Sequence, residues 1–165
     1  MRKNLWLFLL KLLVFSLVLG YLWFSRFQVQ YPYWIDVFAD PFFKLVGVRQ
    51  WWLALVVEHF TNLVPYLALV LASPGLFKHW KRSLIALVAG VAILILGHLL
   101  LSWAVYYFNE KYSLSRSFYR IVVPMYIIND ALPLALWLSF FPRLPSELFG
   151  FRWVGRSSDI NGGTV

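Results

Sequence analysis

Long apolar runs that end at short basic segments constrain this sequence most. The longest run extends from Ser83 to Phe108 and directly follows the basic segment 78–82, and another apolar run lies just before that segment. About 20 apolar residues in a helix cross the hydrocarbon core of a bilayer, and basic residues gather in the loops that stay inside the cell. Two such runs on either side of a short basic loop predict a pair of membrane-spanning helices.

Composition indicates the same class of protein. Of the 165 residues, 61% are hydrophobic and only 13% are charged, whereas soluble domains carry about 25% charged residues. The net charge of +8 is spread between the apolar runs, which predicts contact with anionic lipid head groups and argues against nucleic acid as a partner. The absence of cysteine excludes disulfides, thiolate metal sites and cysteine nucleophiles.

The sequence therefore predicts an all-α integral membrane protein with about four transmembrane helices. We expect one membrane-embedded helical domain over residues 1–154 and a disordered tail over 155–165. The predicted elements are spans at about 5–24, 58–77, 83–108 and 118–141, and an amphipathic helix in the interface at about 34–56.

The segment after the first span has two interpretations. Gln28, Gln30 and Tyr33 suggest a short polar connection, and the pair Asp40-Pro41 suits an N-cap followed by proline at the first helical position. This favours a separate helix lying in the interface. A continuous helix from about residue 41 into the second span is the alternative.

The distribution of basic residues predicts both termini in the cytoplasm. That orientation puts eight Lys and Arg residues on the cytoplasmic side and six on the other, and the clusters at 2–3 and 78–82 lie where orientation is decided. Residues 5–24 lack a small-residue cleavage site and are expected to stay as an uncleaved helix. Within it, Lys11 either extends toward the head groups or pairs with a buried acid such as Asp130.

Asp130 is the most unusual residue, because it lies with Asn129 near the middle of the span expected at 118–141. A carboxylate at the centre of a bilayer costs about 2.5–3.5 kcal/mol, so it must be protonated, paired or next to water. His98 is expected at a comparable depth on the neighbouring span. Asp130, Asn129 and His98 therefore form the candidate intramembrane polar site, either as a proton relay or as hydrogen bonds that lock helices together.

A second polar cluster stands at the outer end of the second expected span. Glu58 and Asn62 are four residues apart and share a helix face, and His59 is offset from them. A metal site needs at least three ligands, so these residues are expected to be solvated at the interface. Only convergence with His98 would assemble the metal site of a membrane hydrolase, and no metal or cofactor is predicted.

The common motifs of catalysis are missing from the sequence. It contains no G-x-S-x-G, no H-E-x-x-H, no phosphate-binding loop and no dinucleotide-binding glycine motif. The pair Glu58-His59 lacks the second histidine that a zinc-protease helix requires. The sequence therefore predicts a protein that is not an enzyme.

Residues 62–75 (NLVPYLALVLASPG) carry a family resemblance, with the basic first span, the Tyr-Pro stretch after it, and Tyr119, Pro124, Pro133 and Trp137 of the last span. Over about residues 30–142 the chain resembles the small membrane proteins encoded with exosortases, in particular the exosortase H-associated membrane proteins. The resemblance implies an accessory role near envelope protein sorting in a bacterial inner membrane. Exosortases use a cysteine for transpeptidation, so that activity does not carry over to this cysteine-free chain.

Together these observations predict a non-catalytic membrane accessory or scaffold protein. Its expected contacts are membrane lipids and a larger, exosortase-like membrane partner. The alternative is a small proton-coupled transporter or channel that uses Asp130 and His98, with a homo-oligomer as its assembly.

Overall fold

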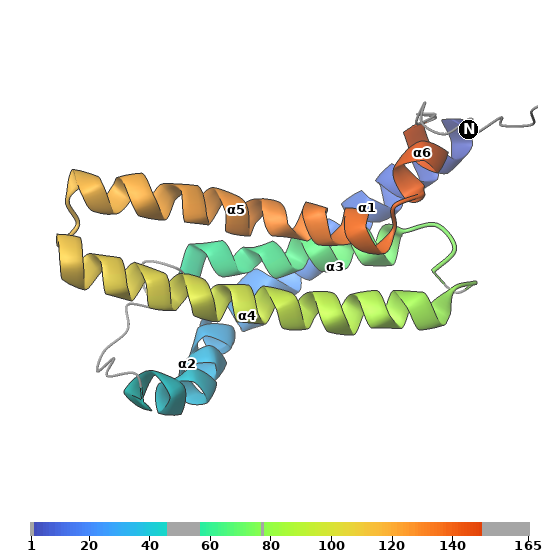
Figure 1. Ribbon diagram of the computed structural model, residues 1–165. Helices are drawn as coiled ribbons and strands as arrows, with labels where there is room; N and C mark the ends of the chain where they lie inside the picture. Colours follow the sequence, from blue (N-terminus) through green and yellow to red (C-terminus); the bar gives the residue numbers. More distant parts are fainter. Residues whose placement is uncertain (1, 46–56, 77, 150–165) are drawn as a thin grey trace, which may run out of the picture.

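The computed structural model describes residues 2–45, 57–76 and 78–149, and every regular element in these ranges is a helix (Figure 1). This confirms the predicted all-α class. The helices are α1 (Arg2–Leu22), the π-helical η1 (Trp23–Phe27), α2 (Gln28–Leu45), the 3₁₀-helical η3 (Val57–Asn62), α3 (Leu63–Ala72), α4 (Trp80–Tyr112), α5 (Arg116–Phe140) and α6 (Leu144–Phe149).

Three helices in the described residues are long and apolar enough to cross a membrane, which supports the prediction of a membrane protein. They cover Asn4–Leu45, Trp80–Tyr112 and Arg116–Phe140. The spans predicted at 5–24, 83–108 and 118–141 lie almost wholly within them. The expected tail at 155–165 lies outside the described residues.

The span predicted at 58–77 is not among these three helices and stays a prediction; in the described residues it corresponds to η3 followed by α3. Its α-helix, α3, has 10 residues and follows the six residues of η3 without a break. Ser73 leaves the helical conformation (ψ 130°) and Gly75 has a φ of +75°, a value that glycine adopts without strain. The Ser-Pro-Gly turn therefore ends α3 and returns the chain to α4.

The predicted polar connection around Gln28–Tyr33 is also wrong, because α1, η1 and α2 follow one another without a break. Pro32 and Pro41 both lie inside α2, and Asp40 does not cap a helix but pairs with Lys44 at 2.6 Å on its surface. A proline cannot donate to the carbonyl one turn earlier. For Pro32 that carbonyl belongs to Gln28, directly after the wide turns of η1, and helices bend at such π-helical and proline positions.

One face of α2 packs on the bundle, and the helix leaves the bundle at an angle to α4 (Figure 1). Its buried side chains recur every four residues, at Tyr31, Ile35, Ala39 and Phe43, which is the spacing of one helical face. The predicted amphipathic helix at 34–56 thus corresponds to α2 over 34–45. Residues 46–56 lie outside the described part of the chain.

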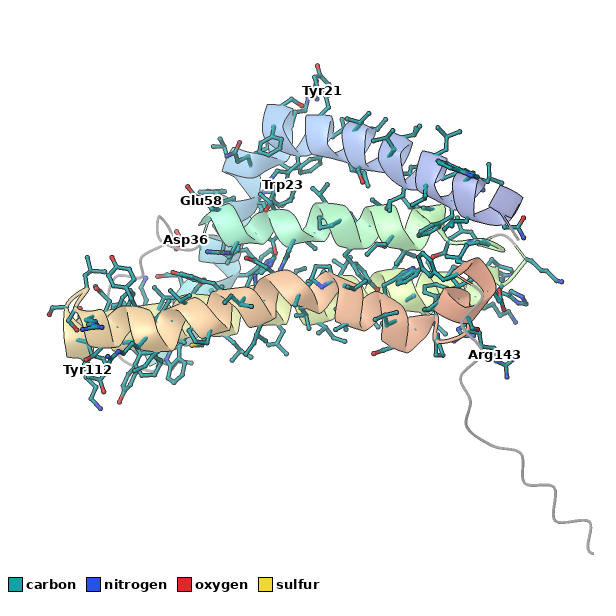
Figure 2. All side chains as sticks on the ribbon, turned by 90° about the horizontal axis from the view of Figure 1, so that it is seen from above. Tyr21, Trp23, Asp36, Glu58, Tyr112 and Arg143 are labelled. Atoms are coloured by element: carbon teal, nitrogen blue, oxygen red, sulfur yellow. The ribbon has the colours of Figure 1, made fainter. Side chains whose placement is uncertain are left out.

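The short helix α3 sits at the centre of the bundle and contacts α1, α4 and α5. In Figure 2, α1 and α5 lie on opposite sides of it. The Tyr66 hydroxyl donates to the carbonyl of Ala86 on α4, and a Cβ atom at Gly90 would lie 1.8 Å from the Tyr66 hydroxyl oxygen. Gly90 therefore allows the buried Tyr66 ring to pass between α3 and α4.

A second joint fixes the end of the bundle at which the Ser-Pro-Gly turn lies. The Trp137 indole N–H of α5 donates to the Ser73 hydroxyl at 2.8 Å, and the Trp137 ring stacks on Phe8 of α1 at 5.9 Å between centroids. α6 and the beginning of α1 lie at this same end (Figure 1). Basic residues of the 78–82 segment and Arg143 are thereby gathered at one end of the molecule.

Candidate functional site: a polar network across the bundle

His98 is the centre of a polar network that joins four helical segments. Its side chain projects inward from α4 and is fully buried, with 0% of the residue exposed. The Tyr31 hydroxyl of α2 lies 2.7 Å from Nδ1 of His98, and the Asn62 side-chain oxygen lies 2.7 Å from Nε2. The Phe60 ring packs 4.6 Å from the imidazole. Both ring nitrogens therefore have partners inside an aromatic enclosure.

The partners of Asn62 determine which atoms carry the hydrogens. The Asn62 amide nitrogen donates to the backbone carbonyl of Asn129 at 3.0 Å, so its side-chain oxygen must face His98. An oxygen accepts, hence Nε2 of His98 carries a hydrogen and Nδ1 accepts one from the Tyr31 hydroxyl. With a neutral imidazole, the Tyr31 hydroxyl, both His98 ring nitrogens and the Asn62 amide all have hydrogen-bond partners. No charge needs to be buried.

Asn129 extends the network to α5. Its amide nitrogen donates to the backbone carbonyl of His59 at 3.2 Å. Asn62 of η3 thus binds a carbonyl of α5, and Asn129 of α5 binds a carbonyl of η3. Within the described residues the Asn129 side-chain oxygen is buried without a hydrogen-bond partner. The two reciprocal amide contacts hold η3 and α5 together where the backbone of η3 departs from an α-helix.

The network ends at a contact between His59 and Asp130 that faces outward. Nδ1 of His59 lies 3.1 Å from both carboxylate oxygens of Asp130, and the His59 ring stacks on Tyr126 with 3.9 Å between centroids. The side chains of His59 and Asp130 are 23% and 52% exposed. Asp130 thus projects from the bundle surface, whereas Asn129, its neighbour in the sequence, points inward.

The structure merges the two clusters that the sequence separated. His98, Asn129 and Asp130 belong to the same network as His59 and Asn62, but Asp130 pairs with His59 and not with His98. Glu58 stays outside it and is exposed; its backbone carbonyl accepts a hydrogen bond from Thr61. Lys11 is also exposed, and the partner of Asp130 is His59.

Sequence reasoning missed Tyr31. Its hydroxyl reaches His98 from α2, and its ring also lies 5.4 Å from Trp23 and 5.5 Å from Phe60. The available signal was the spacing of Tyr31, Ile35, Ala39 and Phe43 on one helical face, which marks Tyr31 as buried and therefore in need of a partner for its hydroxyl.

The hydrogen bonds of the network connect the helices to one another. In the described ranges no group of three or more His, Cys, Asp or Glu side chains is placed to hold a metal ion. The path from His98 to Asp130 runs through two amide side chains and two backbone carbonyls. Amides donate hydrogen bonds but do not titrate, so they orient their partners without passing protons between them.

Comparisons with known proteins return no match. No protein-family model matches the chain, and neither a curated protein nor a solved structure does so. The function is therefore inferred from the network itself and from the surface at which it ends.

Proposed function

We propose that this protein is a non-catalytic integral membrane accessory or scaffold protein that packs against a larger membrane partner. The observation that carries the proposal is the outward-facing contact between His59 of η3 and Asp130 of α5. Polar groups within membrane-spanning segments face a bundle interior, a wet cavity or another protein, because exposure to lipid is costly. An exposed pair at depth therefore calls for a protein that covers it.

The depth of Asp130 follows from its place along α5. It lies ten residues from Arg120 and ten from Phe140, which is about 15 Å along the helix axis in each direction. The hydrocarbon core is about 30 Å thick, so neither end of α5 brings Asp130 close to the head groups. Lipid tails offer no hydrogen bonds to a carboxylate, whereas a partner helix can.

The residues around Asp130 suit helix packing. Ile127 and Leu134 are exposed and lie three residues before and four residues after Asp130, so the three side chains share one face of α5. An apolar seam with one polar position is the pattern by which paired helices set their register. The expected occupant of this face is thus a transmembrane helix with a polar group level with Asp130.

The resemblance noted in the sequence suggests the identity of the partner. It favours an exosortase-type enzyme of a bacterial inner membrane, with both termini of this chain in the cytoplasm. Two structural facts fit that orientation: α6 lies beside the start of α1, and Arg82 and Arg143 lie at the same end. Short basic segments stay on the cytoplasmic side of bacterial membranes.

The proton-coupled transporter stays the alternative prediction from the sequence. It requires protons to pass between Asp130 and His98, and the amide side chains of Asn62 and Asn129 stand between these residues. His98 also has both ring nitrogens engaged inside the bundle. The geometry therefore favours a structural role for His98.

Co-purification tests the proposal. The tagged full-length protein is extracted from its native membranes in mild detergent, with cross-linking and mass spectrometry of what accompanies it. We expect a polytopic membrane enzyme in near-stoichiometric amount, reduced by Asp130→Leu and unchanged by Glu58→Gln, which alters an exposed acid outside the network. Recovery of the protein alone, as a defined oligomer, contradicts the proposal.

A further inference from the structure

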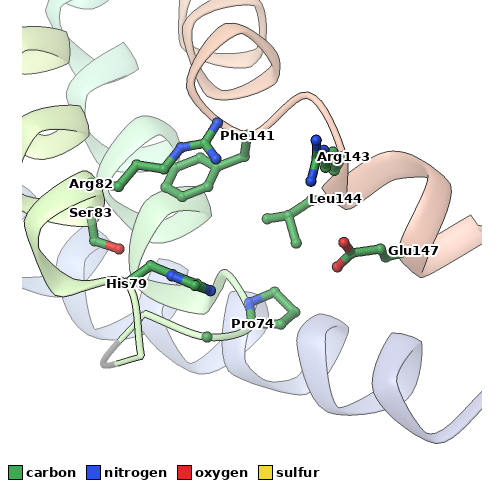
Figure 3. Close-up of a pocket in the computed structure, with 9 residues that line it drawn as sticks. Pro74, His79, Arg82, Ser83, Phe141, Arg143, Leu144 and Glu147 are labelled. Atoms are coloured by element: carbon green, nitrogen blue, oxygen red, sulfur yellow. The ribbon is translucent and has the colours of Figure 1, made fainter.

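A pocket of about 340 Å³ lies at the end of the bundle that holds α6 (Figure 3). It is bounded by the turn between α3 and α4, by the first turn of α4 and by the segment from Phe141 to Glu147. Its polar lining includes Arg82 and Arg143, with Glu147 one helical turn beyond Arg143. Segments distant in the sequence thus build one charged cavity outside the polar network.

Arg82 is held in place before any ligand arrives. One guanidinium nitrogen donates to the backbone carbonyl of Phe140, and the guanidinium carbon lies 5.7 Å from the centre of the Phe141 ring. A guanidinium has five N–H donors, so most of them stay available to a ligand. Fixing the side chain in advance lowers the entropy cost of binding.

Arg143 and Glu147 face the same cavity without neutralising each other. Among described side chains, basic and acidic groups meet between Asp40 and Lys44 and between His59 and Asp130, and neither Arg143 nor Glu147 takes part in such a contact. Figure 3 shows both side chains near Leu144. The cavity therefore offers two cationic guanidinium groups and one separate carboxylate.

We propose that this pocket binds a phosphoethanolamine group, with its phosphate against Arg82 and Arg143 and its ammonium against Glu147. Arginine forms strong, paired hydrogen bonds with phosphate oxygens. A carboxylate repels a simple phosphate but attracts an adjoining ammonium, so the unpaired Glu147 selects the zwitterion. A volume of about 340 Å³ is at the small end of ligand pockets and suits a head group.

The position of the pocket makes a membrane lipid one source of this group. It lies where the apolar stretches of α4 and α5 end, beside the basic segment 78–82. Basic pockets at the ends of transmembrane helices are known to take lipid head groups. A soluble phosphoethanolamine ester carries the same chemistry and would bind the same side chains.

The test uses the full-length protein in nanodiscs that contain equal amounts of phosphatidylethanolamine and phosphatidylglycerol. Lipid retained after transfer to detergent is counted by native mass spectrometry. We expect wild type to retain phosphatidylethanolamine in preference, Arg143→Gln to retain about tenfold less, and Glu147→Gln to lose the preference between the lipids. Arg116→Gln removes the same charge at the opposite end of α5 and should change nothing.

A titration with soluble O-phosphoethanolamine in lipid-free detergent separates the two sources. Binding that depends on Arg143 without lipid retention supports the site and identifies a soluble ester as its source. Equal retention of both lipids by wild type, or retention and titration that Arg143→Gln leaves unchanged, overturns the proposal. The melting temperature of each variant, measured without ligand, shows that a lost signal reflects the site and not unfolding.

Discussion

Removing the Asn62 side chain should cost more stability than the loss of one hydrogen bond. Asn62→Ala leaves two buried groups unsatisfied, the Nε2 hydrogen of His98 and the backbone carbonyl of Asn129. Each orphaned buried group costs about 1–3 kcal/mol. Because lipid-embedded unfolded chains also find hydrogen-bond partners, we take the lower part of this range and expect a total loss of about 2–4 kcal/mol.

The assay is reversible unfolding of the full-length protein in detergent, followed by helical circular dichroism. Thr61→Ala is the matched control, because the neighbouring Thr61 hydroxyl donates to the Glu58 carbonyl in an exposed position and its loss should cost under about 1 kcal/mol. If Asn62→Ala costs no more than Thr61→Ala, the network does not hold the bundle together.

A double variant tests whether His98 and Asn62 are energetically coupled. His98→Leu alone orphans the Tyr31 hydroxyl and the Asn62 oxygen, and Asn62→Ala alone orphans the His98 nitrogen. The double variant lacks both the Asn62 oxygen and the His98 nitrogen, each of which one single change leaves without a partner. The combined loss should therefore fall below the sum of the two single losses by about 1 kcal/mol or more, whereas simple additivity would refute the coupling of His98 to Asn62.

Three further changes probe other joints of the structure. Gly90→Ala should destabilise the protein by about 1–3 kcal/mol in detergent unfolding, because its Cβ would meet the Tyr66 hydroxyl at 1.8 Å. Gly97→Ala should be tolerated, because its Cβ would lie 3.4 Å from a flexible leucine side chain. Equal effects would contradict the close approach of α3 and α4. Trp137→Phe should lower stability by about 1 kcal/mol, because it removes the 2.8 Å hydrogen bond to the Ser-Pro-Gly turn, and an unchanged melting curve would refute that joint. Asp130→Asn should leave unfolding within about 1 kcal/mol of wild type, because the Asp130 side chain is 52% exposed, yet weaken recovery of the partner. A large loss of stability with normal recovery would show that Asp130 serves the fold alone.

Two of the long helices, α4 and α5, could be predicted because length and apolar content decide them locally. The runs that became α4 and α5 carry their boundaries in the sequence, at the basic segment 78–82 and at the polar residues near Ser113. The bounds of α3 within the predicted span 58–77 could not be predicted, because they depend on backbone geometry and not on apolar content. Backbone geometry ends that helix, first at η3 and then at Gly75.

The network could be predicted only in part, because its contacts join residues far apart in the chain. The polar residues His98, Asn129 and Asp130 stood out against their apolar surroundings, which is why they were candidates. Their partners depend on how the helices pack: Tyr31 and His98 are 67 positions apart, as are Asn62 and Asn129. A one-dimensional pattern gives the depth of a polar group but not its partner.

Site-specific photo-cross-linking in native membranes tests the central claim most directly. The reactive residue is placed at Ile127, beside Asp130, or at Leu17 on α1, across the bundle; these positions are 63% and 65% exposed. An accessory protein that docks through α5 should cross-link from Ile127 to one polytopic membrane enzyme, and only to lipid from Leu17. Cross-links from Ile127 to lipid alone, or to a second copy of this chain, would contradict the proposed function.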